Sequence, residues 1–229
     1  MSSEKPQRGP RFQVILFLLS AIAILVALNV VSSFSNTLNR LKAIEAERDS
    51  WQRPLDIMRS LGVRQSSTLV DLGCGAGYFT LKLADVVGGR GEILAVDLRR
   101  LSLFFLRVRA LIRHKHNIRI IVGSPDDPHL PSGRVDAVLI SNTYHEFTNP
   151  RVMLEHTWNA LRRDGRLVIV DRGPRPSDKN AGATSHHEIS RPRVEEELRQ
   201  RGFEILGRED SFIDRPGDEP WWLLIARKP

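Results

Sequence analysis

The stretch at residues 68–77 reads TLVDLGCGAG, an apolar run that contains one acid, Asp71, and ends in three glycines at alternate positions. Glycine adopts positive φ angles and lets the backbone approach a ligand where any Cβ would collide. The next residues, 78–84, have the apolar spacing of a helix. The stretch therefore predicts a buried strand, a tight nucleotide-binding turn and a helix whose N-terminus faces the ligand.

A second acid lies at the end of the next apolar run. Residues 92–97 read EILAVD and predict a second buried strand that ends in Asp97. A carboxylate there suits a ribose diol, because its two oxygens accept both hydroxyl protons. Two kinds of nucleotide site compete at this point. A dinucleotide site requires G-x-G-x-x-G, but Tyr78 occupies the position of the last glycine and Asp71 would repel a pyrophosphate.

The run from Val70 to Gly77, taken with Asp97, resembles the class I S-adenosylmethionine-dependent methyltransferases over roughly residues 40–229. In that family the glycine turn passes under the methionine part of the cofactor, and the acid that ends the second strand holds the ribose hydroxyls. The resemblance implies S-adenosyl-L-methionine as the cofactor, with Asp71 near its sulfonium and amino end. The other cofactor-binding residues that it implies in this region are Gly73, Gly75, Gly77, Asp97 and Leu98.

The rest of the chain alternates predicted strands and helices. Helical spacing predicts helices at residues 99–116, 151–161 and 193–201, and apolar runs predict strands at residues 118–122, 135–140, 167–171, 203–206 and 221–226. Pro150 is expected to open the second of these helices, and Asp164-Gly165 to close it. The alternation predicts an α/β fold with a doubly wound, mostly parallel seven-stranded sheet, the Rossmann-like methyltransferase fold.

Ligands of open α/β sheets bind at the carboxyl ends of the strands, so the loops there hold the remaining candidates. The loop after the third strand carries two adjacent acids, and the resemblance implies an acceptor for the adenine amino group at this point. We assign this role to Asp126, with Asp127 as the alternative; an acid in such a loop is equally typical of a solvated turn. Asn142, after the fourth strand, is a further cofactor-binding candidate.

The catalytic candidates are His145 and Glu146, in a loop that resembles the one lining the methyl group in quinone-type and related small-molecule methyltransferases. Imidazole titrates near neutrality and a neighbouring carboxylate can orient it, so this pair could bind or deprotonate a hydroxyl nucleophile. A histidine that caps the next helix or bonds the backbone is an equal alternative. No metal is predicted, because residue 149 is Asn where H-E-x-x-H requires a second histidine.

A long polar loop, residues 172–190, is rich in Gly, Pro and Ser and has the composition of a lid or substrate loop. It contains His186-His187-Glu188, although histidines in an exposed loop are more often solvated. Cys74 is the single cysteine, which excludes a disulfide within one chain.

Residues 12–31 contain no charge and seventeen apolar side chains, which matches the length of a transmembrane helix. A cleaved signal peptide is the alternative, but its apolar core is typically about 7 to 15 residues long. The predicted organisation is therefore a short polar tail (1–11), a transmembrane helix (12–31), a helical connector broken near Pro54 (32–61) and a methyltransferase domain (62–229).

The orientation of the anchor poses a conflict between two arguments. The basic residues of the short tail favour a cytoplasmic tail and an external domain, whereas S-adenosylmethionine is made in the cytoplasm. We give cofactor supply the greater weight and predict a single-pass membrane protein whose catalytic domain is cytoplasmic. The formal charge is +7 with scattered Lys and Arg, which anionic lipid headgroups explain as well as nucleic acid does, so a nucleic-acid partner is not expected.

These observations predict an enzyme that transfers a methyl group from S-adenosylmethionine to a small-molecule, lipid-like acceptor. A general base is required for a phenol or alcohol acceptor but barely for a neutral amine. Two alternatives stay open: a non-catalytic S-adenosylmethionine-binding scaffold or sensor, and an NAD-dependent oxidoreductase, which the missing glycine disfavours. The sequence does not specify an oligomeric state.

Overall fold

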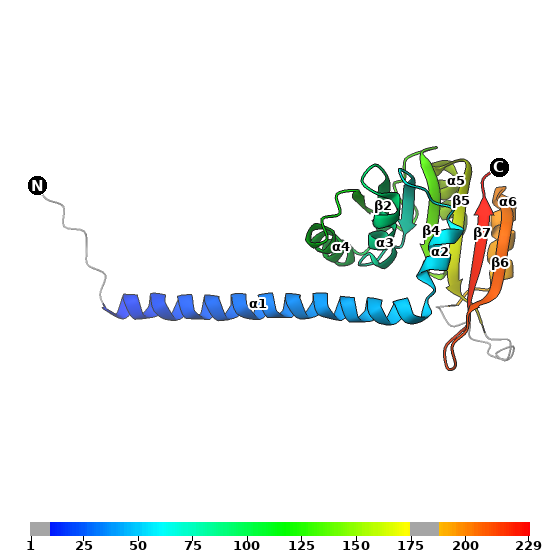
Figure 1. The fold of residues 1–229 in the computed structure, drawn as a ribbon. Coiled ribbons are helices and arrows are strands. Elements are labelled where there is room, and N and C mark those ends of the chain that lie inside the picture. The colour runs from blue at the N-terminus through cyan, green and yellow to red at the C-terminus, as the bar shows by residue number, and fades with distance from the viewer. Residues whose placement is uncertain (1–9, 175–187) are drawn as a thin grey trace, which may run out of the picture. The chain divides into compact units, whose positions relative to one another are not determined.

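The computed structural model describes residues 10–174 and 188–229 (Figure 1). The chain divides into two compact units, Met1–Glu47 and Arg48–Pro229. The histidines at positions 186 and 187 and most of the predicted lid lie outside the described residues. The described residues of the first unit, 10–47, belong to one helix, and the second unit holds the sheet and its helices.

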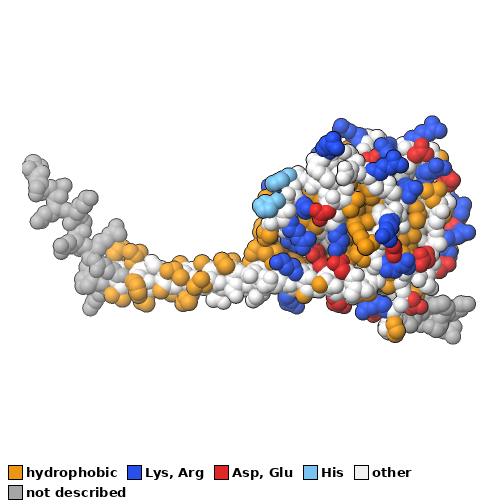
Figure 2. Space-filling model, viewed as in Figure 1, with side chains coloured by type: hydrophobic (Ala, Val, Ile, Leu, Met, Phe, Trp, Pro, Cys, Tyr) orange, Lys and Arg blue, Asp and Glu red, His pale blue; other side chains and the backbone are white. Residues whose placement is uncertain are grey.

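The first unit consists of most of helix α1 (Pro10–Trp51), which is long and apolar enough in its Val14–Trp51 part to cross a membrane. Its apolar side chains are exposed, and Figure 2 shows hydrophobic groups along much of its length. The helix continues into the predicted connector as far as Trp51. It breaks where the sequence predicts, because Arg53 has a φ of 52° and Pro54 opens the short helix α2 (Pro54–Ser60).

The second unit contains a sheet of seven strands, counted over its described residues. In chain order the strands are β1 (Thr68–Leu72), β2 (Glu92–Asp97), β3 (Ile118–Val122), β4 (Val135–Ser141), β5 (Leu161–Arg172), β6 (Glu204–Ile213) and β7 (Trp221–Arg227). Their order across the sheet is β3-β2-β1-β4-β5-β7-β6, with only β7 antiparallel to its two neighbours. The predicted fold class, a doubly wound and mostly parallel sheet, is confirmed.

Helices cover both faces of this sheet, as the continuous apolar runs of its central strands require. The helices are α3 (Tyr78–Val87), α4 (Arg100–Ile112), α5 (Pro150–Ala160), α6 (Arg191–Arg201) and the single 3₁₀ turn η1 (Tyr144–Glu146). Val70 and Ile140 pack with α5 and α6 on one face, whereas Leu69 and Leu139 pack with α2 and α3 on the other. Strand β1 lies between β2 and β4, so the strand order reverses direction at β1. At such a reversal the loops after neighbouring strands turn to opposite sides of the sheet and leave a crevice at the carboxyl ends of the strands.

The helix predicted at residues 151–161 is α5, Pro150–Ala160, but the prediction that Asp164-Gly165 closes it is wrong. The helix stops at Ala160, and Leu161 already has extended backbone angles and pairs with Val135 in the sheet. Asp164-Gly165 lies inside β5, at the point where the register shifts, and Asp164 has a φ of 63°. Burial of Leu161 in the core sets the end of the helix, and Asp164-Gly165 instead forms a β-bulge within β5.

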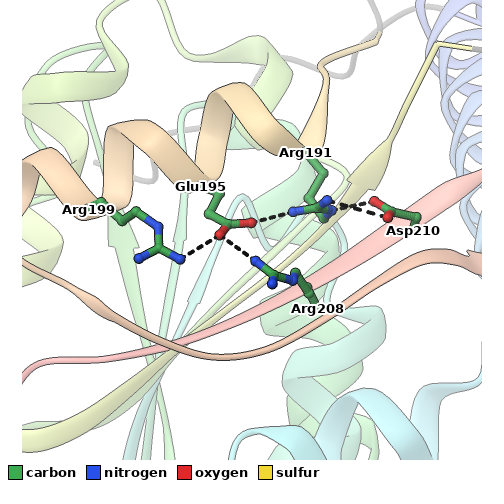
Figure 3. A network of polar contacts seen from close by, with 5 residues as sticks. All are labelled: Arg191, Glu195, Arg199, Arg208 and Asp210. Atoms are coloured by element: carbon green, nitrogen blue, oxygen red, sulfur yellow. Dashed lines mark hydrogen bonds and ion pairs between the residues drawn. The ribbon is translucent and has the colours of Figure 1, made fainter.

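A network of charged side chains ties α6 to the edge strand β6 (Figure 3). Glu195 accepts hydrogen bonds from Arg199 and Arg208 at 2.8 Å each, and it also pairs with Arg191. Arg191 reaches across to Asp210 on β6. The arginines hold the pKa of Glu195 below its usual range, and Arg199 makes the largest contribution. The network therefore fixes α6 against β6.

Candidate functional site

The glycine turn between β1 and α3 requires glycine for two different reasons. Gly73 has a φ of 80°, and a Cβ on it would lie 2.3 Å from the side chain of Thr143. Gly77 has a φ of 90°, and a Cβ there would lie 2.3 Å from Leu106. Gly75 has a φ of 54°, but a Cβ there would meet open space. Packing of the protein itself therefore excludes side chains at two positions, and the third leaves a backbone surface that a ligand can approach.

Asp97 joins the glycine turn to the start of helix α4. Its Oδ2 accepts a hydrogen bond from the backbone N–H of Gly75 at 2.8 Å, and its Oδ1 accepts one from the N–H of Arg99 at 2.8 Å. Asp97 is 5% exposed, so its carboxylate is held rigidly at the carboxyl end of β2. Nε of Arg99 lies 3.4 Å from the same Oδ1. An ionised carboxylate accepts about four hydrogen bonds, which leaves capacity for a hydroxyl group of a ligand.

Asp71 is buried beneath the turn, near the end of β1. Its Oδ2 accepts a hydrogen bond of 2.5 Å from the hydroxyl of Thr80 on α3. Burial raises the pKa of Asp71 to about 6, although the Thr80 hydroxyl and the charge of Arg48 both act to lower it. The group thus titrates near neutrality, and a neighbouring cation would favour its ionised form.

A cavity of about 270 Å³ opens at the carboxyl ends of β1, β2 and β4. Four of the predicted site residues line it: Gly73, Asp97, Leu98 and Glu146. Six predicted residues do not: Asp71, Gly75, Gly77, Asp126, Asn142 and His145. Most of the apolar and hydroxyl-bearing lining is not among the predicted site residues: Ser124, Pro125, Pro128, Thr143, Phe147 and Met153. Their place after β3 and β4 was the available signal, since ligands of such sheets bind there.

Neither acid of the loop after β3 lines the cavity. Asp126 is exposed in a tight turn, whereas its neighbours Ser124 and Pro125 line the cavity. Asp127 accepts a hydrogen bond from the backbone N–H of His129 at 2.7 Å, and this contact lowers its pKa. Asp127 is thus engaged within its own loop.

The last residue of β4 and the residue after it each hold a buried polar atom without a hydrogen-bond partner among the described residues, Oγ of Ser141 and Oδ1 of Asn142. The backbone of Asn142 has a φ of 55°, and its N–H donates to the carbonyl of Val170 at 2.7 Å. Buried polar atoms normally have partners, so an acceptor held in this way beside the cavity residue Thr143 is suited to a ligand.

The partner of His145 is different from the one that the sequence analysis proposed. Nδ1 of His145 lies 2.7 Å from Oδ1 of Asp171, and the backbone N–H of His145 donates to Oδ2 of the same residue at 3.1 Å. Glu146 is farther away, with its Oε1 3.9 Å from Nε2 of His145. The side chains of His145 and Asp171 are 2% and 0% exposed. The orienting carboxylate is therefore Asp171, at the end of β5, and Glu146 faces the cavity instead.

Asp171 could have been found from the sequence, because it ends a buried strand as Asp97 does. Its pairing could not, since 26 residues separate it from His145 and only the β4–β5 register brings them together. Within residues 10–174 and 188–229, no group of three or more His, Cys, Asp or Glu side chains is arranged to hold a metal ion.

The fold, the glycine turn and the placement of Asp97 define the class: the second unit carries a class I methyltransferase fold. Residues 70–169 match the family described as "Methyltransferase domain", a span that runs from β1 to the middle of β5. A solved structure of a SAM-dependent methyltransferase from Aquifex aeolicus superposes with a TM-score of 0.70 at 20% identity, covering 83% of this chain and 98% of that one.

Two curated relatives share this region. Demethylmenaquinone methyltransferase of Lactococcus lactis is 23% identical over 144 residues, which cover 62% of this chain and 56% of the relative. Nocamycin O-methyltransferase of Saccharothrix syringae is 27% identical over 134 residues, which cover 58% of this chain and 47% of the relative. The chain thus aligns with about half the length of these curated relatives.

Proposed function

We propose that the protein transfers a methyl group from S-adenosyl-L-methionine to a small, apolar acceptor. The observation that carries this proposal is the cavity at the carboxyl ends of β1 and β2, where the Asp97 carboxylate and the glycine turn are joined by a direct hydrogen bond. The family match over residues 70–169 and the relatives, which are named for methyl transfer to a quinone precursor and to an oxygen, support it.

The residues present fit the proposed cofactor. Asp97 has spare acceptor capacity for a ribose hydroxyl, and the open space at Gly75 admits the close approach of a ligand to the backbone. Asp71 supplies a negative charge for the sulfonium and amino end, and Asn142 brings a buried acceptor that needs a donor. We assign cofactor binding to these four residues together with Gly73 and Leu98, which line the cavity. The cofactor supplies a methyl group on a positively charged sulfur, which an acceptor displaces in line.

The chain's own contribution is alignment of the acceptor and exclusion of water. The lining by Leu98, Phe147 and Met153 favours an apolar acceptor. Of the two predicted catalytic residues, Glu146 lines the cavity and His145 does not, so Glu146 is the group placed to receive a proton from a hydroxyl acceptor. His145, held by Asp171, acts as a positioning residue next to Glu146 in this proposal.

We further propose that α1 is an uncleaved single-pass anchor and that the domain lies on the cytoplasmic side. The helix is long and apolar enough to span a bilayer, and the cofactor is made in the cytoplasm. A reporter enzyme fused after Pro229 that is active only outside the cytoplasm would overturn this orientation. A mature protein that lacks residues 1–31 by mass spectrometry would show instead that the segment is a signal peptide.

Binding and turnover of the full-length protein in nanodiscs test the proposal. Calorimetry with S-adenosylmethionine, its demethylated product and NAD is expected to show binding of the first two only, and Asp97→Ala should weaken it by about 1 to 3 kcal/mol. Membrane extracts incubated with protein and isotopically labelled methyl donor should yield a labelled small molecule by mass spectrometry. Binding of NAD alone would refute the proposal, and cofactor binding without any labelled product would favour a scaffold or sensor.

A further inference from the structure

Helix α4 has an exposed apolar face in addition to the face that packs on the sheet. The inward residues are buried in the core: Leu103, Leu106 and Ala110. Leu101, Leu111 and Ile112 are 70%, 62% and 58% exposed, and Phe104 is 51% exposed. With about 3.6 residues per turn, these four side chains project from one side of the helix, opposite the core. A surface helix normally presents polar residues on that side, so the apolar face requires an explanation.

Positively charged side chains border this face, and the segment that carries it contains no acid. Residues 98–122 contain seven Lys and Arg and no acid. Arg100 and Arg107 are exposed, and they lie four residues before Phe104 and Leu111, beside the apolar face. Asp97, which precedes α4, bonds the backbone of Gly75 and both the backbone and the side chain of Arg99, and Asp85 pairs with Lys115. The surface therefore combines apolar side chains with uncompensated cations.

The apolar face continues to the mouth of the cavity. Leu98, two residues before α4 begins, is 53% exposed and also lines the cavity, as does the adjacent Arg99. Leu98 therefore places an exposed apolar side chain at the cavity, two residues before the helix that carries the apolar face.

We propose that the outer face of α4, formed by Leu98, Arg100, Leu101, Phe104, Arg107, Leu111 and Ile112, docks on the surface of an anionic lipid bilayer. Apolar side chains along one side of a helix, bordered by arginines, are the features of interfacial helices, which bury the apolar side at the level of the acyl boundary and place the cations at the phosphates. Pairing with a second copy of α4 would bring two clusters of arginines together, which is unfavourable. The docking rests on the anchor proposed for α1, which would hold the chain at a bilayer and raise the effective concentration of α4 at its surface.

The docking is tested with the full-length protein in nanodiscs by site-specific fluorescence. An environment-sensitive probe is attached to Leu101→Cys, with Glu196→Cys on the exposed side of α6 as the matched control; the native Cys74 is buried. Discs of phosphatidylcholine are compared with discs that also contain phosphatidylglycerol, and each carries spin-labelled lipid as a quencher. The Leu101→Cys probe should be blue-shifted and quenched in the anionic discs, and the Glu196→Cys probe should be neither.

Two double variants test whether the arginines beside the apolar face contribute to docking on the lipid. Arg100→Gln with Arg107→Gln should lower the ratio of docked to undocked protein by about fivefold per arginine. Arg151→Gln with Arg163→Gln removes the same charge from exposed positions elsewhere and should leave the ratio unchanged. All substituted side chains are exposed, and far-UV circular dichroism verifies that the variants fold.

Three results would overturn the proposal. One is equal quenching at Leu101→Cys and Glu196→Cys, and another is no quenching at either site. The third is a Leu101→Cys probe that is shielded to the same degree in detergent and in both kinds of disc, because protein rather than lipid would then cover α4. These outcomes do not depend on methyl transfer, so the docking and the proposed function fail separately.

Discussion

Binding of the cofactor is expected to depend on the protonation of Asp71. Burial raises the pKa of this carboxyl from 3.8 to about 6, so its ionised fraction changes strongly between pH 7 and pH 5. The proposed ligand is cationic at its sulfur and amino group, and only ionised Asp71 attracts it. Lowering the pH should therefore weaken binding, even though the ligand itself stays charged over this range.

The size of the effect follows from the pKa. About ten of eleven molecules carry ionised Asp71 at pH 7 and about one of eleven at pH 5, so the apparent affinity should fall about tenfold, or about 1.4 kcal/mol. Near pH 6, binding should release about half a proton, because the cation drives the remaining protonated fraction to ionise.

Calorimetry in buffers of different ionisation enthalpy measures both quantities on the same protein. Asp71→Asn should bind the cofactor more weakly at pH 7 and show no pH slope between pH 5 and 7. Thr80→Val removes the hydroxyl that bonds the charged form, so the midpoint of the pH dependence should move upward. The demethylated product lacks the sulfonium charge and should show a smaller slope.

The free energy of unfolding of the cofactor-free protein gives an independent measurement, because the contribution of Asp71 to it falls as the pH rises, whereas cofactor binding strengthens. The native state holds a proton on Asp71 between pH 3.8 and about 6 that the unfolded state releases, so this group's contribution falls as the pH rises through that window. Above pH 6 the charged group costs about 3 kcal/mol, and Asp71→Asn should raise the free energy of unfolding at pH 8. An unchanged pH slope of cofactor binding in Asp71→Asn would refute the assignment of Asp71 to the site.

The remaining predictions concern the turn, the edge network and the buried pair. Gly73→Ala should lower the free energy of unfolding by about 2 to 4 kcal/mol, and Gly75→Ala by about 1 to 2 kcal/mol while weakening cofactor binding more than tenfold; denaturant titration and calorimetry check the pair, and the reverse order would contradict the packing at Gly73. Glu195→Gln should lower the free energy of unfolding at pH 7 by about 1 to 3 kcal/mol, a modest loss because two of its arginine partners are more than half exposed to solvent. Because the pKa of Glu195 is lower in the folded state than its ordinary value of 4.5, this difference from the native protein should shrink as the pH falls below 4.5. A difference that does not change with pH would show that charge is not the cause. Asp171→Asn should lower kcat at least tenfold with unchanged cofactor affinity, and an unchanged kcat would reduce the pair with His145 to a structural contact.

The fold was accessible from local patterns, and its errors lie where tertiary contacts outweigh them. The strand that ends at Leu72 and the strand that ends at Asp97 follow from apolar runs that only a sheet covered on both faces can bury. Helix α5 ends within one residue of its predicted end, but Asp164-Gly165 does not close it, because burial of Leu161 against Val135 draws the chain into the sheet directly after Ala160. At this point the burial of Leu161 in the core outweighs the turn preference of Asp164-Gly165.

The sequence by itself determined the doubly wound sheet, the glycine turn and the acid that faces it, because alternate glycines and strand-ending carboxylates are constraints carried by neighbouring residues. Only the tertiary structure decided that Asp171 holds His145, that Glu146 borders the cavity in its place and that α4 presents apolar side chains to the outside. Those facts depend on strand register and helix rotation, which bring together residues far apart in the chain and which no local pattern encodes.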